Sequence, residues 1–323
     1  MNDSPSTPNI GQSLRRWLAH PLTRGLDVDD PRTTELRKRI IAEKPFLRRI
    51  YQEWYEMLAG AIPPLSPSPC TQGEGRGEGS SGRPCSLPES KCDPHPNPLP
   101  EYGSTSLTAG MERGRDQRRS GAVLELGSGA GFLDQYIPGL ITSDLFPCPG
   151  IKCVLDGQRL PLADATLRAI VMIDVLHHLP HARLFFAEAA RCVRPGGVIA
   201  MIEPWNTPWA KWVYQHLHAE PFETESTTWE FPAQGPLSGA NMALPWIILQ
   251  RDRAQFEREF PQWRVKKLRA FMPFRYLVSG GVGFKNLMPS FTFSLWRGVE
   301  KCLSPLHNQL GMFVFAVLER SES

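Results

Sequence analysis

The stretch VLELGSGAGFL, from Val123 to Leu133, runs an apolar strand that contains the acid Glu125 into a glycine-rich turn. Because Gly127, Gly129 and Gly131 carry no Cβ, the backbone can turn sharply there and approach a ligand closely. We expect a helix after the turn, with unpaired N–H groups at its start. The pattern predicts either a nucleotide-sized site or a simple turn between packed elements, since both use this glycine spacing.

Two neighbouring features narrow the choice of ligand. Phe132 occupies the sixth position of the G-x-G-x-x-G frame, where a dinucleotide-binding loop needs a small residue, so a pyrophosphate cofactor is disfavoured. A second apolar segment, 140–143, ends in Asp144, whose carboxylate can accept hydrogen bonds from two ribose hydroxyls. The alternative role for Asp144 is to cap the next turn.

The following segment alternates short apolar runs with polar helical stretches. Strands are expected at 151–155, 168–173 and 198–202, and a helix is expected at 181–193. Runs that are almost entirely apolar indicate strands buried on both faces, as in a parallel sheet covered by helices. The sequence therefore predicts an α/β fold.

Five short motifs follow one another here: the E-x-G-x-G-x-G loop of residues 125–131, Asp144, Asp156, LHHL at 176–179 and RPGG at 194–197. In this order they make residues 122–205 resemble the core of a class I S-adenosylmethionine-dependent methyltransferase of the broad type 11 group. The resemblance implies a Rossmann-like, seven-stranded, mostly parallel sheet of order 3-2-1-4-5-7-6, with helices on both faces and an antiparallel last strand. Strands near 263–269 and 311–319 are expected to complete the sheet.

The resemblance also implies S-adenosyl-L-methionine as the cofactor. Glu125 is expected near its ammonium group, Asp144 at the ribose and Asp156 at the adenine amino group. Alternatively, Glu125 only ties the glycine loop to neighbouring amides, and Asp156 only caps a turn. The full set of expected cofactor contacts is Glu125, Gly127, Ser128, Gly129, Gly131, Asp144, Leu145, Asp156, Gly157, Ile173 and Asp174.

Methyl transfer from a sulfonium needs mainly positioning and, for some acceptors, removal of a proton. His177 and His178 are the candidate bases because imidazole titrates near neutral pH. Packing and hydrogen bonding at a helix start are the alternative role for both. Glu203, a third candidate catalytic residue, and Trp205 follow the fifth strand and are expected to face the same crevice.

Composition limits the class of protein. A formal net charge of +3 without a strong basic stripe does not predict nucleic-acid binding. Seven cysteines without a CxxC pair argue against a zinc site and a disulfide framework, so no metal is expected. The first ten residues lack a signal-peptide pattern and no apolar run reaches membrane-spanning length. We expect a cytoplasmic protein without an obligate protein partner.

The chain divides into three predicted regions. Residues 1–62 form an N-terminal helical extension that begins a helix at Asp30-Pro31 and packs over the cofactor entrance. Residues 63–121 form a disordered insertion rich in proline and glycine, either a passenger or a proline-rich partner-binding segment. Residues 122–323 form the methyltransferase domain, with an apolar insertion at about 271–310. That insertion is either additional core or a cap that contacts lipid at the inner face of the membrane.

The predicted function is transfer of a methyl group from S-adenosylmethionine to a small or lipid-linked acceptor by in-line displacement. Two alternatives stay open. One is a cofactor-binding scaffold that has lost catalysis. The other is an NAD-type Rossmann oxidoreductase, which Phe132 disfavours.

Overall fold

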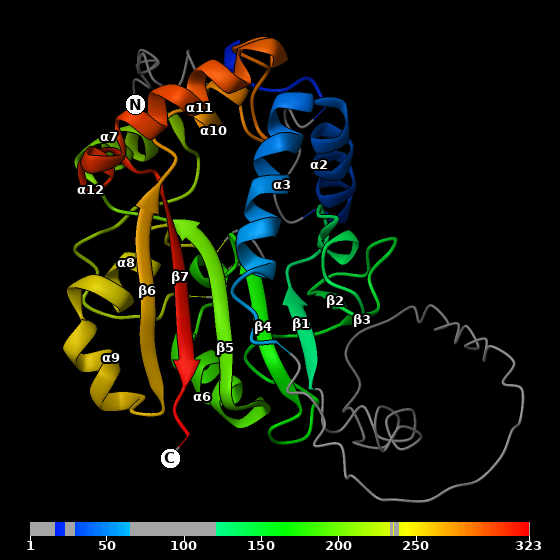
Figure 1. The fold of residues 1–323 in the computed structure, drawn as a ribbon, viewed down its shortest axis with the longest axis vertical. Helices are drawn as coiled ribbons and strands as arrows, with labels where there is room; N and C mark the ends of the chain where they lie inside the picture. Colours follow the sequence, from blue (N-terminus) through cyan, green and yellow to red (C-terminus); the bar gives the residue numbers. More distant parts are fainter. Residues whose placement is uncertain (1–16, 23–29, 65–120, 233–234, 236–238, 323) are drawn as a thin grey trace, which may run out of the picture.

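A computed structural model describes residues 17–22, 30–64, 121–232, 235 and 239–322 (Figure 1). Seven strands form one sheet of order β3-β2-β1-β4-β5-β7-β6. The strands are β1 (Ala122–Leu126), β2 (Ile141–Asp144), β3 (Cys153–Val154), β4 (Leu167–Ile173), β5 (Val193–Pro204), β6 (Trp263–Phe271) and β7 (Phe313–Arg320). The helices are α2 (Pro31–Glu43), α3 (Pro45–Ala59), α6 (Ala182–Cys192), α7 (Pro208–Leu217), α8 (Leu244–Trp246), α9 (Arg253–Glu259), α10 (Arg275–Ser279), α11 (Phe293–Cys302) and α12 (His307–Leu310).

The strand directions confirm the predicted topology. Strands β3, β2, β1, β4 and β5 run parallel to one another, whereas β7 is antiparallel to both β5 and β6. In the central register Ile170 lies between Leu124 and Ile199, and all three are fully buried. Burial on both faces explains why these strands are almost continuously apolar. The carboxyl ends of the parallel strands therefore meet at one edge of the sheet.

The helix expected after the glycine turn is absent, and this prediction was wrong. All residues between β1 and β2 are described, and they contain only a single 3₁₀ turn, Leu133–Gln135. Pro138-Gly139 ends the segment too early for a longer helix. The rings of Phe132 and Tyr136 pack instead against Tyr55 of α3, at 4.8 and 5.5 Å between centroids. The N-terminal extension thus covers this part of the sheet.

The other expected elements form with shifted ends. Strand β5 starts at Val193 rather than at 198, because Val193 already pairs with Leu167 before a register shift. RPGG therefore belongs to the strand, with Gly196 at φ +73°. The helix expected at 181–193 corresponds to α6, and α7 and α9 follow beyond β5. The last of these follows α8 and a π-helical turn, Ile247–Arg251.

The N-terminal region contains two helices, α2 and α3, rather than one continuous helix. Asp30 caps α2 by accepting a hydrogen bond from the Arg32 amide, as its position before proline predicts. The Lys44-Pro45 pair separates α2 from α3, since the residue before a proline avoids helical geometry. Of the predicted insertion 63–121, residues 65–120 lie outside the described residues.

The 271–310 insertion connects β6 to β7 and lies beyond the carboxyl ends of the parallel strands (Figure 1). It is joined to the N-terminal helices by Trp54, which stacks on Tyr276 at 5.6 Å. Lys44 reinforces this contact, because its Nζ donates to the carbonyls of three residues in the insertion, Ser279, Gly281 and Phe284. Among the described helices, none has the length and apolarity needed to cross a membrane.

Candidate functional site

A cavity of about 440 Å³ lies at the carboxyl ends of β1, β2 and β4. Its volume falls in the range of small-molecule and cofactor sites. Its described lining comes from the strand ends, the glycine turn, α2, α3 and the insertion. The residues are Thr34, Arg37, Tyr51, Tyr55, Glu125, Leu126, Gly127, Ala130, Gly131, Asp144, Leu145, Leu155, Asp156, Gly157, Gln158, Ile173, Asp174, Val175, His178, Leu179, Pro180, Gly235 and Val282.

The glycine turn lies against neighbouring side chains that leave no room for a Cβ. Gly127 has φ +71°, and a Cβ there would lie 2.5 Å from Cγ2 of Val175. At Gly131 a Cβ would lie 2.7 Å from the Tyr55 hydroxyl oxygen. Protein groups already accept from several loop amides: Asp144 from Gly129, and Tyr55 from Phe132. The turn therefore shapes the cavity by close approach rather than by a row of unpaired amides.

Glu125 is buried beneath this turn. Its Oε2 accepts a hydrogen bond of 2.7 Å from the Ser128 hydroxyl. Burial raises the pKa of Glu125 to about 7, although the Ser128 hydrogen bond opposes the shift. The carboxyl therefore titrates near neutral pH, and a cation in the cavity would favour its charged form.

Asp174 faces the cavity from the end of β4 in an uncommon backbone conformation. Its φ is +55°, in the left-handed region that only a few non-glycine residues adopt. Its Oδ1 is buried and has no hydrogen-bond partner among the described residues. Burial raises the pKa of Asp174 to about 7; the charge of His177 opposes this shift, and the carboxylates Glu203 and Glu220 add to it. A strained residue with an unsatisfied buried oxygen is a strong candidate for contact with a ligand.

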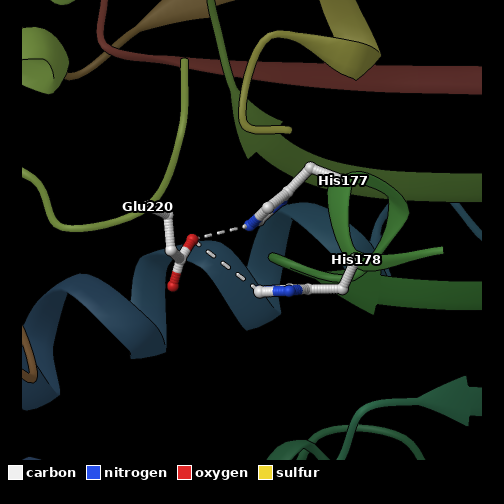
Figure 2. Close-up of side chains that lie close together, drawn as sticks. All are labelled: His177, His178 and Glu220. Atoms are coloured by element: carbon white, nitrogen blue, oxygen red, sulfur yellow. Dashed lines mark ion pairs between the residues drawn. The ribbon is translucent and has the colours of Figure 1, made fainter. Parts of the chain in front are cut away.

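A second polar group lies beside Asp174, where β4 leads into the LHHL turn. Glu203, fully buried at the end of β5, accepts from the amides of Val175 and Leu176 and from Nδ1 of His177, the last at 2.7 Å. Nε2 of His177 lies 3.5 Å from Oε2 of Glu220, and Nε2 of His178 lies 3.9 Å from the same oxygen (Figure 2).

The two histidines have opposite electrostatic environments. Burial by itself lowers the pKa of His177, but Glu203 and Glu220 outweigh it, so that the pKa rises to about 10. Burial and the charge of His177 lower the pKa of His178 to about 3. Burial by itself would raise the pKa of Glu220, but the neighbouring histidines outweigh burial and hold this pKa well below its ordinary value.

The structure brings most of the sequence-predicted residues to one cavity. Those that line it are Glu125, Gly127, Gly131, Asp144, Leu145, Asp156, Gly157, Ile173, Asp174 and His178. Ser128, Gly129, His177 and Glu203 are absent from its described lining. Ser128 and Gly129 donate hydrogen bonds to two residues of the lining, Glu125 and Asp144 respectively. Glu203 accepts from the backbone of the turn that carries the histidines. Trp205 is buried and also lies outside this lining.

Several site residues could not be identified from the sequence. Thr34, Arg37, Tyr51 and Tyr55 reach the cavity from α2 and α3, although only a general packing of this region over the entrance was expected. Glu220 lies in an irregular segment after α7 and carries no motif. The one signal in the sequence is that Glu220 follows the fifth strand, because segments that follow the strands of an open α/β sheet often line the ligand crevice.

The charges of the described lining identify the kind of ligand that fits. It carries four carboxylates, Glu125, Asp144, Asp156 and Asp174, against one guanidinium, Arg37. An acidic cavity favours a ligand with cationic groups and hydroxyl donors, and it disfavours a pyrophosphate. The buried, unsatisfied Oδ1 of Asp174 adds a further acceptor for such a ligand.

Comparison with known proteins finds one matching family model. Residues 124–201 match the family model of a methyltransferase domain, a segment that runs from β1 into β5. No curated protein sequence matches the chain. The matched segment contains the glycine turn, Asp144, Asp156 and both histidines, so it includes the central motifs on which the resemblance rests.

Solved structures that resemble the chain include two geranyl diphosphate methyltransferases. One, the C-methyltransferase from Streptomyces coelicolor A3(2) in complex with Mg²⁺, geranyl diphosphate and S-adenosyl-L-homocysteine, is 12% identical, with a TM-score of 0.42 over 98% of this chain and 100% of that one. The other, in complex with S-adenosylmethionine, is 13% identical, with a TM-score of 0.40 over 94% and 96%. A [4+2]-cyclase, SpnF, is 12% identical, with a TM-score of 0.35 over 63% and 76%.

The family match and the strand order agree with each other, and the acidic cavity suits a sulfonium cofactor better than a dinucleotide. Residues 124–201 therefore match a methyltransferase domain, within a sheet whose strand order is the one expected from the sequence.

Proposed function

We propose that this protein transfers the methyl group of S-adenosylmethionine to a small or lipid-linked acceptor that enters the cavity beside Asp174 and His178. The observation that supports this most directly is the acidic lining at the carboxyl edge of the sheet. S-adenosylmethionine carries an ammonium and a sulfonium but no phosphate, so its charge is complementary to this lining.

The proposed cofactor contacts follow the lining. Glu125 is assigned to the ammonium group, Asp144 to the ribose and Asp156 to the adenine amino group, and the same lining includes Gly127, Gly131, Leu145, Gly157, Ile173 and Asp174. Asp144 uses Oδ2 to accept from Gly129, at 2.9 Å, and a carboxylate retains further lone pairs for ribose hydroxyls. Ser128 and Gly129 support Glu125 and Asp144 rather than line the cavity themselves.

When bound, the cofactor would supply a methyl group activated on sulfur, and S-adenosylhomocysteine would leave as the acceptor forms a bond to the methyl carbon in line with the breaking carbon–sulfur bond. The chain contributes position and exclusion of water, through Tyr51 and Tyr55 of α3 on one side of the cavity and Val282 of the insertion. Asp174 and His178 line the wall at the end of β4, and we assign the acceptor to this wall. His177 and Glu203 are positioning residues in this proposal, because they hold the turn from outside the described lining.

Calorimetry tests the proposal. The full chain should bind S-adenosylmethionine or S-adenosylhomocysteine saturably and should not bind NAD or NADH. Binding of the dinucleotide alone would refute it. A catalytically inactive scaffold is distinguished by incubation with labelled cofactor and a heat-inactivated cell extract, because an acceptor then becomes labelled only if this protein transfers the methyl group.

We further propose that the 271–310 insertion contacts an anionic lipid surface, from which a lipid-linked acceptor would enter. Apolar side chains are exposed on this insertion at Phe291 (85%), Leu295 (68%), Leu287 and Met288, and at Trp17 beside it. Lys285 and Lys301 are exposed on the same segment. Its one acid, Glu300, is buried and bonded to Arg275, so the exposed surface of the insertion is apolar and basic.

Vesicle flotation tests the lipid contact. The protein should float with vesicles rich in anionic phospholipid and much less with vesicles of zwitterionic phospholipid alone. The double variant Phe291→Ser, Leu295→Ser should lose this binding. The matched control is Leu184→Ser, which removes an exposed leucine from α6. Equal flotation of all three proteins would exclude this surface as the contact.

A further inference from the structure

His177, His178 and Glu220 form a cluster that the methyl-transfer chemistry does not require (Figure 2). The two imidazoles come from the turn after β4, and the carboxylate comes from the segment after α7. All three side chains are largely buried, with exposed fractions of 3%, 13% and 18%. Buried polar groups of this kind normally pair directly or share a bound group.

The separations within the cluster are too long for good hydrogen bonds. Oε2 of Glu220 lies 3.5 Å from Nε2 of His177 and 3.9 Å from Nε2 of His178. Neighbouring ligand atoms of a tetrahedral zinc ion lie about 3.3 Å apart, as follows from bonds of about 2 Å. The three ligand atoms lie within 4.8 Å of one another, so small side-chain rotations would close them around one ion.

The surroundings orient His177 as a ligand. Its Nδ1 donates to Glu203 at 2.7 Å, and Glu203 is itself fixed by two backbone amides. This contact places a proton on Nδ1 and directs Nε2 toward Glu220. A carboxylate that holds the far nitrogen of an imidazole is the usual outer partner of a histidine ligand.

His178 supplies a second, independent observation. Its Nδ1 is buried and has no hydrogen-bond partner among the described residues, although the ring also interacts with the backbone of Gly239. Its ring lies 4.2 Å from the ring of His177, which brings both Nε2 atoms to the same side of the turn (Figure 2). His178 also lines the main cavity, so an ion held here would lie at the cavity wall.

We infer that His177, His178 and Glu220 bind a divalent first-row transition-metal ion, with Glu203 as the outer partner of His177. Two imidazoles and one carboxylate suit Zn²⁺ or Co²⁺ better than Mg²⁺, which prefers oxygen ligands. Three protein ligands leave at least one position for water or for an acceptor group. The inference concerns binding and is independent of the methyl-transfer proposal.

Titration with Co²⁺ tests this site in the full, untagged chain. We expect one tight equivalent, with visible absorption bands typical of nitrogen and oxygen ligands in four- or five-coordination, and competition by Zn²⁺. Glu220→Gln and His178→Ala should each weaken this binding by at least about tenfold, and Glu203→Gln by about tenfold to a hundredfold. His216→Asn, which removes a histidine of α7 outside the cluster, is the matched control.

Circular dichroism and melting of each variant show whether it folds, and His178→Ala keeps the test decisive if Glu220→Gln does not. Absence of the tight equivalent in the wild-type chain would overturn the inference. So would a tight equivalent that persists in both folded variants. In either case the ion pair between His177 and Glu220 would account for the cluster.

Discussion

Replacement of Glu125 by glutamine should change how the stability of the protein depends on pH. The side chain is 6% exposed, and burial raises its pKa from 4.5 to about 7. Between these values the folded chain holds a proton that the unfolded chain has released. The protonated group therefore supports the fold fully below about pH 4.5, and this support is lost as the pH rises through about 7.

The size of the effect follows from the shift. At 1.36 kcal/mol per pKa unit, the Glu125 contribution to the free energy of unfolding falls by about 2.5 kcal/mol between about pH 5 and about pH 8. Glutamine is uncharged at both pH values, and its amide oxygen can still accept from the Ser128 hydroxyl. Glu125→Gln should therefore lose about 2.5 kcal/mol less than the wild type over this interval.

Urea unfolding of the cofactor-free protein at the two pH values measures this difference. Asp174, whose pKa is also raised by burial, contributes to the pH dependence of both proteins, so comparison of the two slopes isolates Glu125. Glu257→Gln, which removes a half-exposed carboxylate of α9, is the control for loss of one charge. The change in the free energy of unfolding between the two pH values should differ between Glu125→Gln and wild type. If it differs by less than about 1 kcal/mol, burial does not raise the pKa of Glu125 as described.

Three further substitutions test other parts of the structure. Asp144→Ala should weaken S-adenosylmethionine binding by about 1.5–3 kcal/mol, or about tenfold to a hundredfold in Kd by calorimetry, and an unchanged Kd would remove Asp144 from the site. Gly127→Ala should lower the free energy of unfolding by at least about 1 kcal/mol, because of its positive φ and the approach to Val175, whereas Gly298→Ala, with open space around it, should not destabilise the protein. Lys44→Met leaves three carbonyls of the insertion without their donor and should cost about 2–4 kcal/mol in urea unfolding; an unchanged midpoint would show that water replaces it.

The strands of the sheet could be predicted because each one is specified by residues that are adjacent in the sequence. Each central strand is a short apolar run, and the acids that follow, Asp144 and Asp174, mark where the strands end. Parallel strands place such residues at one edge, so the positions of the motifs along the chain already imply a shared cavity. The antiparallel β7 followed from the family resemblance rather than from spacing.

The missing helix after β1 shows where local information failed. The glycine turn favours a helix, but Phe132 and Tyr136 pack on Tyr55, which lies more than 70 residues earlier in the chain. Tertiary contact of this kind overrides a local preference. The same limit applies to Glu220, because nothing in its neighbours along the sequence indicates that it meets His177. The absence of a CxxC pair predicts only the absence of a cysteine-based zinc site. It cannot reveal a cluster such as His177, His178 and Glu220, because these residues come from separate segments of the chain.

The raised pKa values of Glu125 and Asp174 connect the stability of the protein to its ligand. A cavity that buries carboxylates without enough counter-charge is costly, and the protein lowers this cost by keeping the groups protonated near neutral pH. A ligand that carries positive charge would lower these raised pKa values, because it stabilises the ionised carboxylates. The same lining disfavours a dinucleotide, because the negative pyrophosphate would further oppose ionisation of these carboxylates. The electrostatic cost of the ligand-free cavity is therefore itself an argument for a cationic cofactor, independent of the glycine turn that first indicated a binding site.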